Sequence, residues 1–191
     1  MKNKTLLSFI IFSIVINILF IVSAVLKLVY NGQPYTAIFI TLFMFVYHID
    51  IRVIIGFIVS LFKSKINIKS KAFIISKKEF TLLEKMGVKK LNKHIITMYK
   101  NQFILSNSCD SHCIEIILKN NINAEIVHRL CFILGLFAIL FGYFLSNDEI
   151  LIYILTSILA SVLFDLPSIL LERYNRHRLQ KIFNRKQTIS R

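Results

Sequence analysis

Residues 37–62 read AIFITLFMFVYHIDIRVIIGFIVSLF, an apolar run in which His48, Asp50 and Arg52 stand near the middle. About 20 mostly apolar residues cross the hydrocarbon core of a bilayer as an α-helix. The stretch therefore predicts a transmembrane helix. Its three ionisable residues are costly at that depth, and such residues usually have a partner or a functional role.

Three more apolar runs accompany this one along the chain of 191 residues. Hydrophobic residues make up 55% of the sequence, with 17 Phe and no Trp, and the mean hydropathy is +0.65. This composition excludes an ordinary soluble domain. It predicts an all-α integral membrane protein, one membrane domain over residues 1–191. We expect its four transmembrane helices at about residues 6–27, 36–62, 126–145 and 149–171.

The first run is not expected to be a cleaved signal peptide. It lacks a small-x-small cleavage site after its apolar core, and it is longer than the apolar region of a typical signal. The N-terminal helix is therefore counted as a span.

The 24 Lys and Arg residues predict the orientation of these helices. Two lie in the N-terminal MKNK, 12 in the loop 63–125, and seven in the tail 172–191. The short connections NGQPY and SNDE contain none. Because basic residues are retained on the cytoplasmic side, both termini and the basic loop region between the second and third helices are expected there.

The net charge of +14 has a related explanation. Basic segments held on the inner face attract the anionic headgroups of membrane lipids. No helix-turn-helix, zinc-finger or RNA-binding sequence pattern is present. Membrane lipids are therefore expected partners, and nucleic acid is not; the sequence does not predict an oligomeric state.

Three cysteines, Cys109, Cys113 and Cys131, lie in the cytoplasmic loop or just inside the membrane on this topology. The stretch CDSHC groups Cys109, His112 and Cys113, which are zinc-ligand types. A fourth ligand at a standard spacing is absent. We expect free thiols, because the cytoplasm disfavours disulfides, and neither a metal nor a cofactor.

The intramembrane charges predict a helix–helix pair. His48 and Arg52 are four residues apart and share a helical face, whereas Asp50 points elsewhere. Asp165 lies about two turns before the cytoplasmic end of the fourth span, where Pro167 is expected to distort the helix. Arg52 and Asp165 are the expected ion pair. It could lock the helices together, serve function, or do both.

Glu125 and His128 begin the third span in the stretch NAEIVHRL, residues 123–130. A separation of three places them on one helical face at the inner headgroups. A carboxylate beside an imidazole can hold one tautomer and raise its basicity, as a general base requires. The structural alternative pairs Glu125 with Arg129 at i+4 and leaves His128 as an interfacial histidine.

Three arginines follow the fourth span and are expected at the same depth in the membrane as Glu125 and His128. With Asp165 and His48, they are expected to form one polar cluster in the cytoplasmic third of the bundle. These residues are Arg173, Arg176 and Arg178.

Two sequence motifs resemble those of a known family of membrane proteins. AEIVH at residues 124–128 and ERYNRHRL at residues 172–179 resemble motifs of the membrane family named for staphylococcal glycosyl-4,4'-diaponeurosporenoate acyltransferase. The resemblance is closer to uncharacterised relatives in low-GC Gram-positive bacteria and extends over about residues 45–182. YHIDIR, LEKMG and LNK follow the family in order. His177 replaces a proline of the family pattern, and Tyr99-Lys100 replaces a Trp-Lys pair.

The resemblance implies transfer of a fatty acyl group from a cytoplasmic thioester donor to a hydroxyl of a membrane glycolipid or similar lipid-linked acceptor. The donor would be an acyl-CoA or acyl-carrier protein, and the enzyme would lie in the bacterial cytoplasmic membrane. Glu125 and His128 would be catalytic. The remaining candidates would bind substrate: His48, Arg52, Lys100, Asp165, Arg173, Tyr174, Asn175, Arg176 and Arg178.

Motifs of other acyltransferases and hydrolases, HxxxxD and GxSxG, are absent from the sequence. Direct transfer is therefore expected in place of an acyl-enzyme intermediate. The alternative is a non-enzymatic membrane protein, such as an immunity, accessory or assembly factor, in which the polar intramembrane residues are structural.

Overall fold

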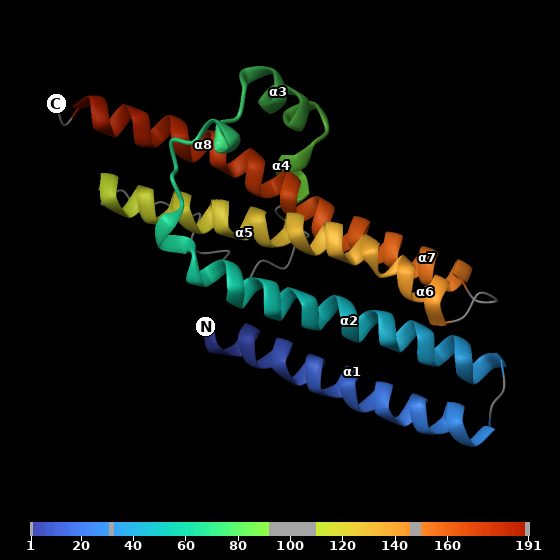
Figure 1. Cartoon of the computed structure of the whole chain (residues 1–191). Helices are drawn as coiled ribbons and strands as arrows, with labels where there is room; N and C mark the ends of the chain where they lie inside the picture. The colour runs from blue at the N-terminus through green and yellow to red at the C-terminus, as the bar shows by residue number, and fades with distance from the viewer. Residues whose placement is uncertain (1, 31–32, 92–109, 146–149, 190–191) are drawn as a thin grey trace. The chain divides into compact units, whose positions relative to one another are not determined.

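A computed structural model describes residues 2–30, 33–91, 110–145 and 150–189, and among these the chain is helical without strands (Figure 1). The α-helices, two 3₁₀ turns (η1, η2) and one π-helical segment (η5) follow in chain order: α1 Lys2–Tyr30, α2 Gln33–Leu61, η1 Lys63–Lys65, η2 Lys71–Phe73, α3 Lys77–Lys85, α4 Val88–Leu91, α5 Ser111–Phe137, α6 Ile139–Leu145, α7 Ile150–Ala160, η5 Ser161–Asp165 and α8 Leu166–Ile189.

Four helical stretches within the described residues are long and apolar enough to cross a membrane. They are Ile11–Tyr30, Tyr35–Leu61, Ser111–Phe144 and Ile150–Thr188. The predicted all-helical membrane class with four spans is therefore confirmed, and the protein is multi-pass. The cytoplasmic placement of both termini and of the basic loop stays a prediction.

The last two spans belong to helices that are longer than the apolar runs alone. α5 begins at Ser111, where Asp110 Oδ1 accepts a hydrogen bond of 2.7 Å from the Cys113 backbone N–H. α8 continues through the basic tail to Ile189. Much of the expected loop end and tail is therefore rigid helix.

The chain divides into two compact units. The first unit contains residues 1–55 and 130–165, and the second unit contains residues 56–129 and 166–191. The description of the whole chain as one membrane domain stays a prediction.

In the first unit, α1 and α2 run side by side in opposite directions (Figure 1). The rings of Phe20 and Phe39 stack at 5.3 Å between centroids. A buried core of Ile40, Met44 and Tyr153, with Ala138, links α2 to α6 and α7. Only 6% of the α1 apolar window is buried, so most of that surface is available for lipid.

The fourth span changes geometry before its proline. Residues Ser161–Asp165 form a π-helical segment, and α8 follows from Leu166. Pro167 has no backbone N–H to continue the regular ladder, and π turns are a common way for a helix to absorb such a defect. The distortion expected at Pro167 is therefore a π turn, and it includes Asp165.

The second unit includes the end of α2 from Gly56, followed by two short turns and a capped helix. Ser76 Oγ accepts a hydrogen bond of 3.2 Å from the Glu79 N–H and so caps α3. Gly87, at φ 70°, supplies the left-handed residue that separates α3 from α4. Both helices pack on α8 through a buried cluster: Leu83, Val88, Leu171 and Tyr174.

α5 and α8 also pack together within the second unit. Their shared core contains Ile114, Leu118, Leu179 and Phe183. Asn121 Nδ2 donates to the Glu172 backbone carbonyl at 3.1 Å and also to its carboxylate. These contacts fix α5 against the part of α8 that carries the RYNR motif.

Candidate functional site

Glu125 on α5 is the centre of a charged cluster in the second unit. Its side chain is only 2% exposed. Arg129 Nη2 lies 2.6 Å from Oε1, and Arg173 Nη1 donates to the same oxygen at 3.0 Å. Arg176 forms an ion pair with Oε2. Three guanidinium groups therefore converge on one buried carboxylate.

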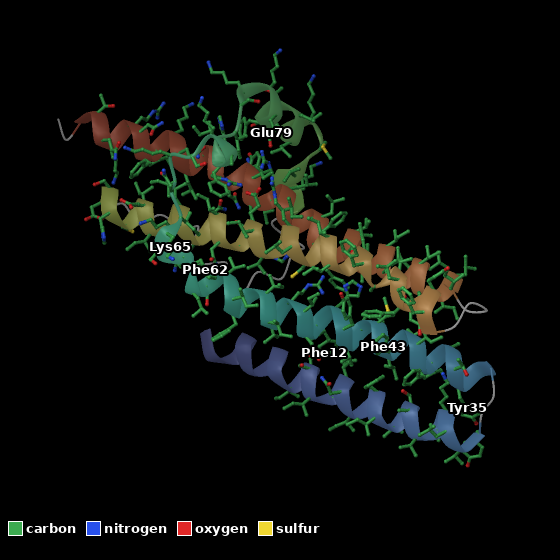
Figure 2. The ribbon with its side chains drawn as sticks, in the orientation of Figure 1. Phe12, Tyr35, Phe43, Phe62, Lys65 and Glu79 are labelled. Atoms are coloured by element: carbon green, nitrogen blue, oxygen red, sulfur yellow. The ribbon has the colours of Figure 1, made fainter. Side chains whose placement is uncertain are left out.

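Arg173 connects this carboxylate to α3. Its Nε donates to Oε1 of Glu79, whose place on α3 is labelled in Figure 2. The hydrogen bond from Arg173 lowers the pKa of Glu79 below its usual value, and burial opposes this in part. We call Glu79, Glu125, Arg129, Arg173 and Arg176 the arginine–carboxylate cluster. Its formal charge is +1, because three arginines face two carboxylates.

Arg176 has hydrogen-bonding capacity that its neighbours do not fill. The residue is 0% exposed, and its guanidinium lies 5.7 Å from the centre of the Phe73 ring. Nε and Nη1 have no hydrogen-bond acceptor among the residues that the structure describes. Because an unsatisfied buried donor is costly, the site is suited to an oxygen atom of a ligand that carries negative charge.

The cluster is bordered by aromatic rings. Phe80 on α3 stacks with Tyr174 at 5.2 Å and with His177 at 4.2 Å between ring centroids. Tyr174 and Asn175 are buried, whereas Arg178 is exposed. Of the residues predicted from RYNR, Arg173 and Arg176 therefore contact Glu125, and Tyr174 anchors α3 to α8.

His128 lies on α5, three residues after Glu125, and is half-buried. The predicted sharing of a helical face follows from the continuous helix. The alternative pairing of Glu125 with Arg129 is confirmed by their ion pair. Orientation of the His128 ring by Glu125 stays a prediction, since the carboxylate contacts described above are to arginines.

The predicted intramembrane pair is present in the first unit. Arg52 Nη2 lies 2.6 Å from Asp165 Oδ2, and the side chains are 19% and 0% exposed. Arg52 Nη1 also donates to the His48 carbonyl at 2.5 Å. The pairing of Arg52 with Asp165 is therefore confirmed.

His48 is 3% exposed, and neither ring nitrogen has a hydrogen-bond partner within the described part of the chain. Gly135 permits this packing: a Cβ there would lie 2.7 Å from His48 Cε1 and 2.6 Å from Ser161 Oγ. His48 and Asp165 belong to the first unit, and Glu125 and the arginines to the second. The single polar cluster expected from sequence stays a prediction.

Some residues that contribute contacts to the site were not predicted from the sequence. Ser76 and Glu79 have capping-box spacing, which signals the start of α3. That signal does not indicate that the Glu79 side chain meets Arg173, 94 residues away. Glu172 belongs to the quoted ERYNRHRL stretch, but its partner Asn121 has no recognisable motif.

The cysteine prediction needs correction. Cys131 is a buried free thiol, but Cys113 is disulfide-bonded. The expectation of free thiols rested on compartment chemistry alone, and the disulfide-bonded state of Cys113 contradicts it. Cys109 and Lys100 lie outside the described residues. Among those described, no group of three His, Cys, Asp or Glu side chains could hold a metal.

The arginine–carboxylate cluster lies within a region shared with known proteins. The family described as glycosyl-4,4'-diaponeurosporenoate acyltransferase matches residues 69–185, which is more than half of the chain. No curated protein and no solved structure matches the chain. All five cluster residues fall inside the matched region. The chain therefore belongs to the glycosyl-4,4'-diaponeurosporenoate acyltransferase family.

Proposed function

We propose that the protein transfers a fatty acyl group from a cytoplasmic thioester to a hydroxyl of a membrane glycolipid or similar lipid-linked acceptor. The observation that carries the proposal is the arginine–carboxylate cluster, which lies in the region matched to an acyltransferase family. Its excess positive charge and the open donors of Arg176 suit a reaction in which negative charge develops on oxygen.

The reaction has a simple balance of bonds. The acceptor oxygen attacks the thioester carbonyl carbon, and the carbonyl oxygen becomes an oxyanion. The carbon–sulfur bond then breaks, leaving an ester and a thiol. In this proposal Arg176 donates hydrogen bonds to the oxyanion. Removal of one comparable donor in other enzymes costs about 3–4 kcal/mol of transition-state stabilisation.

His128 is proposed as the general base. It removes the proton of the acceptor hydroxyl during attack and returns a proton to the departing sulfur. Glu125 has a positioning role in this scheme, because its carboxylate holds Arg129, Arg173 and Arg176 in one place. It also limits the repulsion among the three guanidinium groups.

The other predicted site residues are proposed to bind substrate. Arg173 and Lys100 would steady anionic parts of the donor, which arginine and lysine recognise well. Tyr174 and Asn175 would shape the site from α8. His48, Arg52 and Asp165 of the first unit remain proposed substrate-binding residues.

Lipid profiling of cells with and without the gene tests the proposal. We expect an acylated lipid that depends on the gene and that disappears in His128→Ala while the variant remains inserted and abundant. His112→Ala is the matched control, because His112 is an exposed histidine on the same helix. It should retain the product.

A second pair of variants distinguishes the effect of disrupting the arginine–carboxylate cluster from the effect of removing any carboxylate from α5. Glu125→Gln should lower product per inserted molecule, whereas Glu115→Gln should not. Glu115 is the control because its ion pair with Lys119, at 2.9 Å, also has i,i+4 spacing on α5 but is partly exposed. Full product from an abundant His128→Ala protein would remove the assigned base. Product that follows protein level in every variant would favour the non-enzymatic alternative.

A further inference from the structure

A basic pocket lies in the second unit beside the aromatic rings of α3 and α8. Its volume is about 260 Å³, and it is lined by Phe80, His177, Arg178, Lys181, Ile182 and Arg185. We call it the α3–α8 pocket. Pockets for whole drug-sized ligands usually measure about 300–1,000 Å³. The α3–α8 pocket is therefore sized for the end of a larger molecule.

The pocket concentrates positive charge that is not neutralised. Arg178, Lys181 and Arg185 recur every three or four residues, so they share one face of α8. All three are exposed. None forms an ion pair with a residue that the structure describes. By contrast, Arg176 and Arg173, two and five residues before Arg178, are paired with carboxylates.

An aromatic surface adjoins these charges. His177 and Phe80 stack at 4.2 Å and both line the pocket. Rings beside several cations provide a stacking surface for a base together with donors for phosphate oxygens. This combination matches a phosphorylated nucleotide better than it matches an isolated phosphate.

The position of the pocket along α8 favours a soluble ligand over a lipid headgroup. A rise of 1.5 Å per residue places Arg178 about 10 Å and Arg185 about 21 Å beyond Leu171, the last residue of the predicted apolar run. The headgroup layer is about 5–8 Å thick on each side of the hydrocarbon core. If α8 leaves the membrane along its axis, the pocket lies in the cytoplasm beyond the headgroup phosphates.

We propose that the α3–α8 pocket binds the phosphorylated nucleotide of a coenzyme A thioester. This inference rests on the proposed acyl transfer and identifies the class of donor. The 3'-phosphate and the diphosphate of coenzyme A carry about three to four negative charges together, which three cations complement. The thioester arm extends from the pocket.

Calorimetric titration of coenzyme A into the purified full chain, in a nonionic detergent, tests the proposal without catalysis. The pocket variant carries Arg178→Ala, Lys181→Ala and Arg185→Ala. Its affinity should fall at least about tenfold, as expected for losing charge-assisted hydrogen bonds. 3'-Dephospho-coenzyme A should bind the wild type several-fold more weakly than coenzyme A, and this preference should vanish in the pocket variant.

A charge-matched control removes the same three charges elsewhere in the second unit. It carries Lys85→Ala, Lys89→Ala and Lys90→Ala, all at exposed positions outside the pocket. Its affinity for coenzyme A should change less than about threefold, because distant exposed charges contribute little. Equal loss in both variants would overturn the pocket in favour of general electrostatic attraction.

Other outcomes also decide the question. Absence of coenzyme A binding by the wild type, even with binding of an acyl-carrier protein, would overturn the inference. The inference would also be overturned if the pocket variant bound coenzyme A normally but no longer sedimented with vesicles that contain anionic lipid. That result would identify the pocket as a headgroup site. Coenzyme A binding without any acyl transfer would leave the pocket in place and remove the proposed function, so the two failures are distinguishable.

Discussion

Removal of either partner of the Arg52–Asp165 pair should destabilise the first unit strongly. The two groups are 2.6 Å apart, and the Asp165 side chain is fully buried. Breaking a buried ion pair on one side costs about 3–5 kcal/mol, because the remaining charge loses its compensation. Arg52→Leu and Asp165→Leu should therefore each lower the free energy of unfolding by about 3 kcal/mol or more.

The double variant with Arg52→Leu and Asp165→Leu distinguishes a coupled ion pair from two independent charges. When both charges are replaced by leucine, no uncompensated charge remains, and a well-packed apolar pair can approach the stability of the ion pair. The loss in the double variant should be smaller than either single loss. A coupling energy of about 3 kcal/mol or more follows, at the upper end of measured values for contacting residues.

The assay is unfolding of the purified protein in mixed micelles by increasing sodium dodecyl sulfate, followed by circular dichroism. Asp50→Leu provides a control on α2, since Asp50 is a half-buried carboxylate of the same helix. Its effect should be below about 1 kcal/mol. Additive losses for Arg52→Leu and Asp165→Leu, giving about 6 kcal/mol in the double variant, would refute the pairing as the reason for either charge.

Gly135→Ala should destabilise the first unit by about 1–3 kcal/mol through overpacking, whereas Gly56→Ala, with nothing within 4 Å of the added Cβ, should not; thermal unfolding measures both. Glu79, whose pKa is lowered from 4.5 chiefly by the Arg173 hydrogen bond, contributes stability above that pH and loses it as pH falls further. Glu79→Gln should therefore flatten the fall in unfolding temperature below about pH 5, and an unchanged profile would argue against this role. Single cysteines at Gly32 or Asn147, in a background without the native cysteines, should react with an impermeant reagent from outside only; labelling from the cytoplasmic face would overturn the predicted topology.

The sequence was most informative where physical constraints leave few solutions. Hydrocarbon requires backbone hydrogen bonds to be satisfied within a helix, so apolar length was sufficient to identify all four spans. Arg52 and Asp165 were predictable partners because a charge in a span needs compensation, and both spans run in the same predicted direction. Pro167 signalled a break in regular geometry for a similarly local reason.

The arginine–carboxylate cluster was only partly predictable. Arg173 and Arg176 were expected near Glu125 because span four ends where span three begins. Their convergence on both Glu125 oxygens depends on how α8 is rotated against α5, which side-chain packing determines. Glu79 was unpredictable, because capping accounts for its position without indicating its distant partner.

The proposed acyl transfer is tested most directly with purified protein, an isotopically labelled acyl thioester and a lipid extract from the producing cell. Wild-type protein should form a labelled ester in the lipid fraction. Arg176→Ala should form at least about a hundredfold less when equal amounts of folded protein are compared. Lys186→Ala, which removes a charge elsewhere on α8, should retain full activity. Equal ester formation by wild type and Arg176→Ala would contradict the claim that the arginine–carboxylate cluster is the site of acyl transfer.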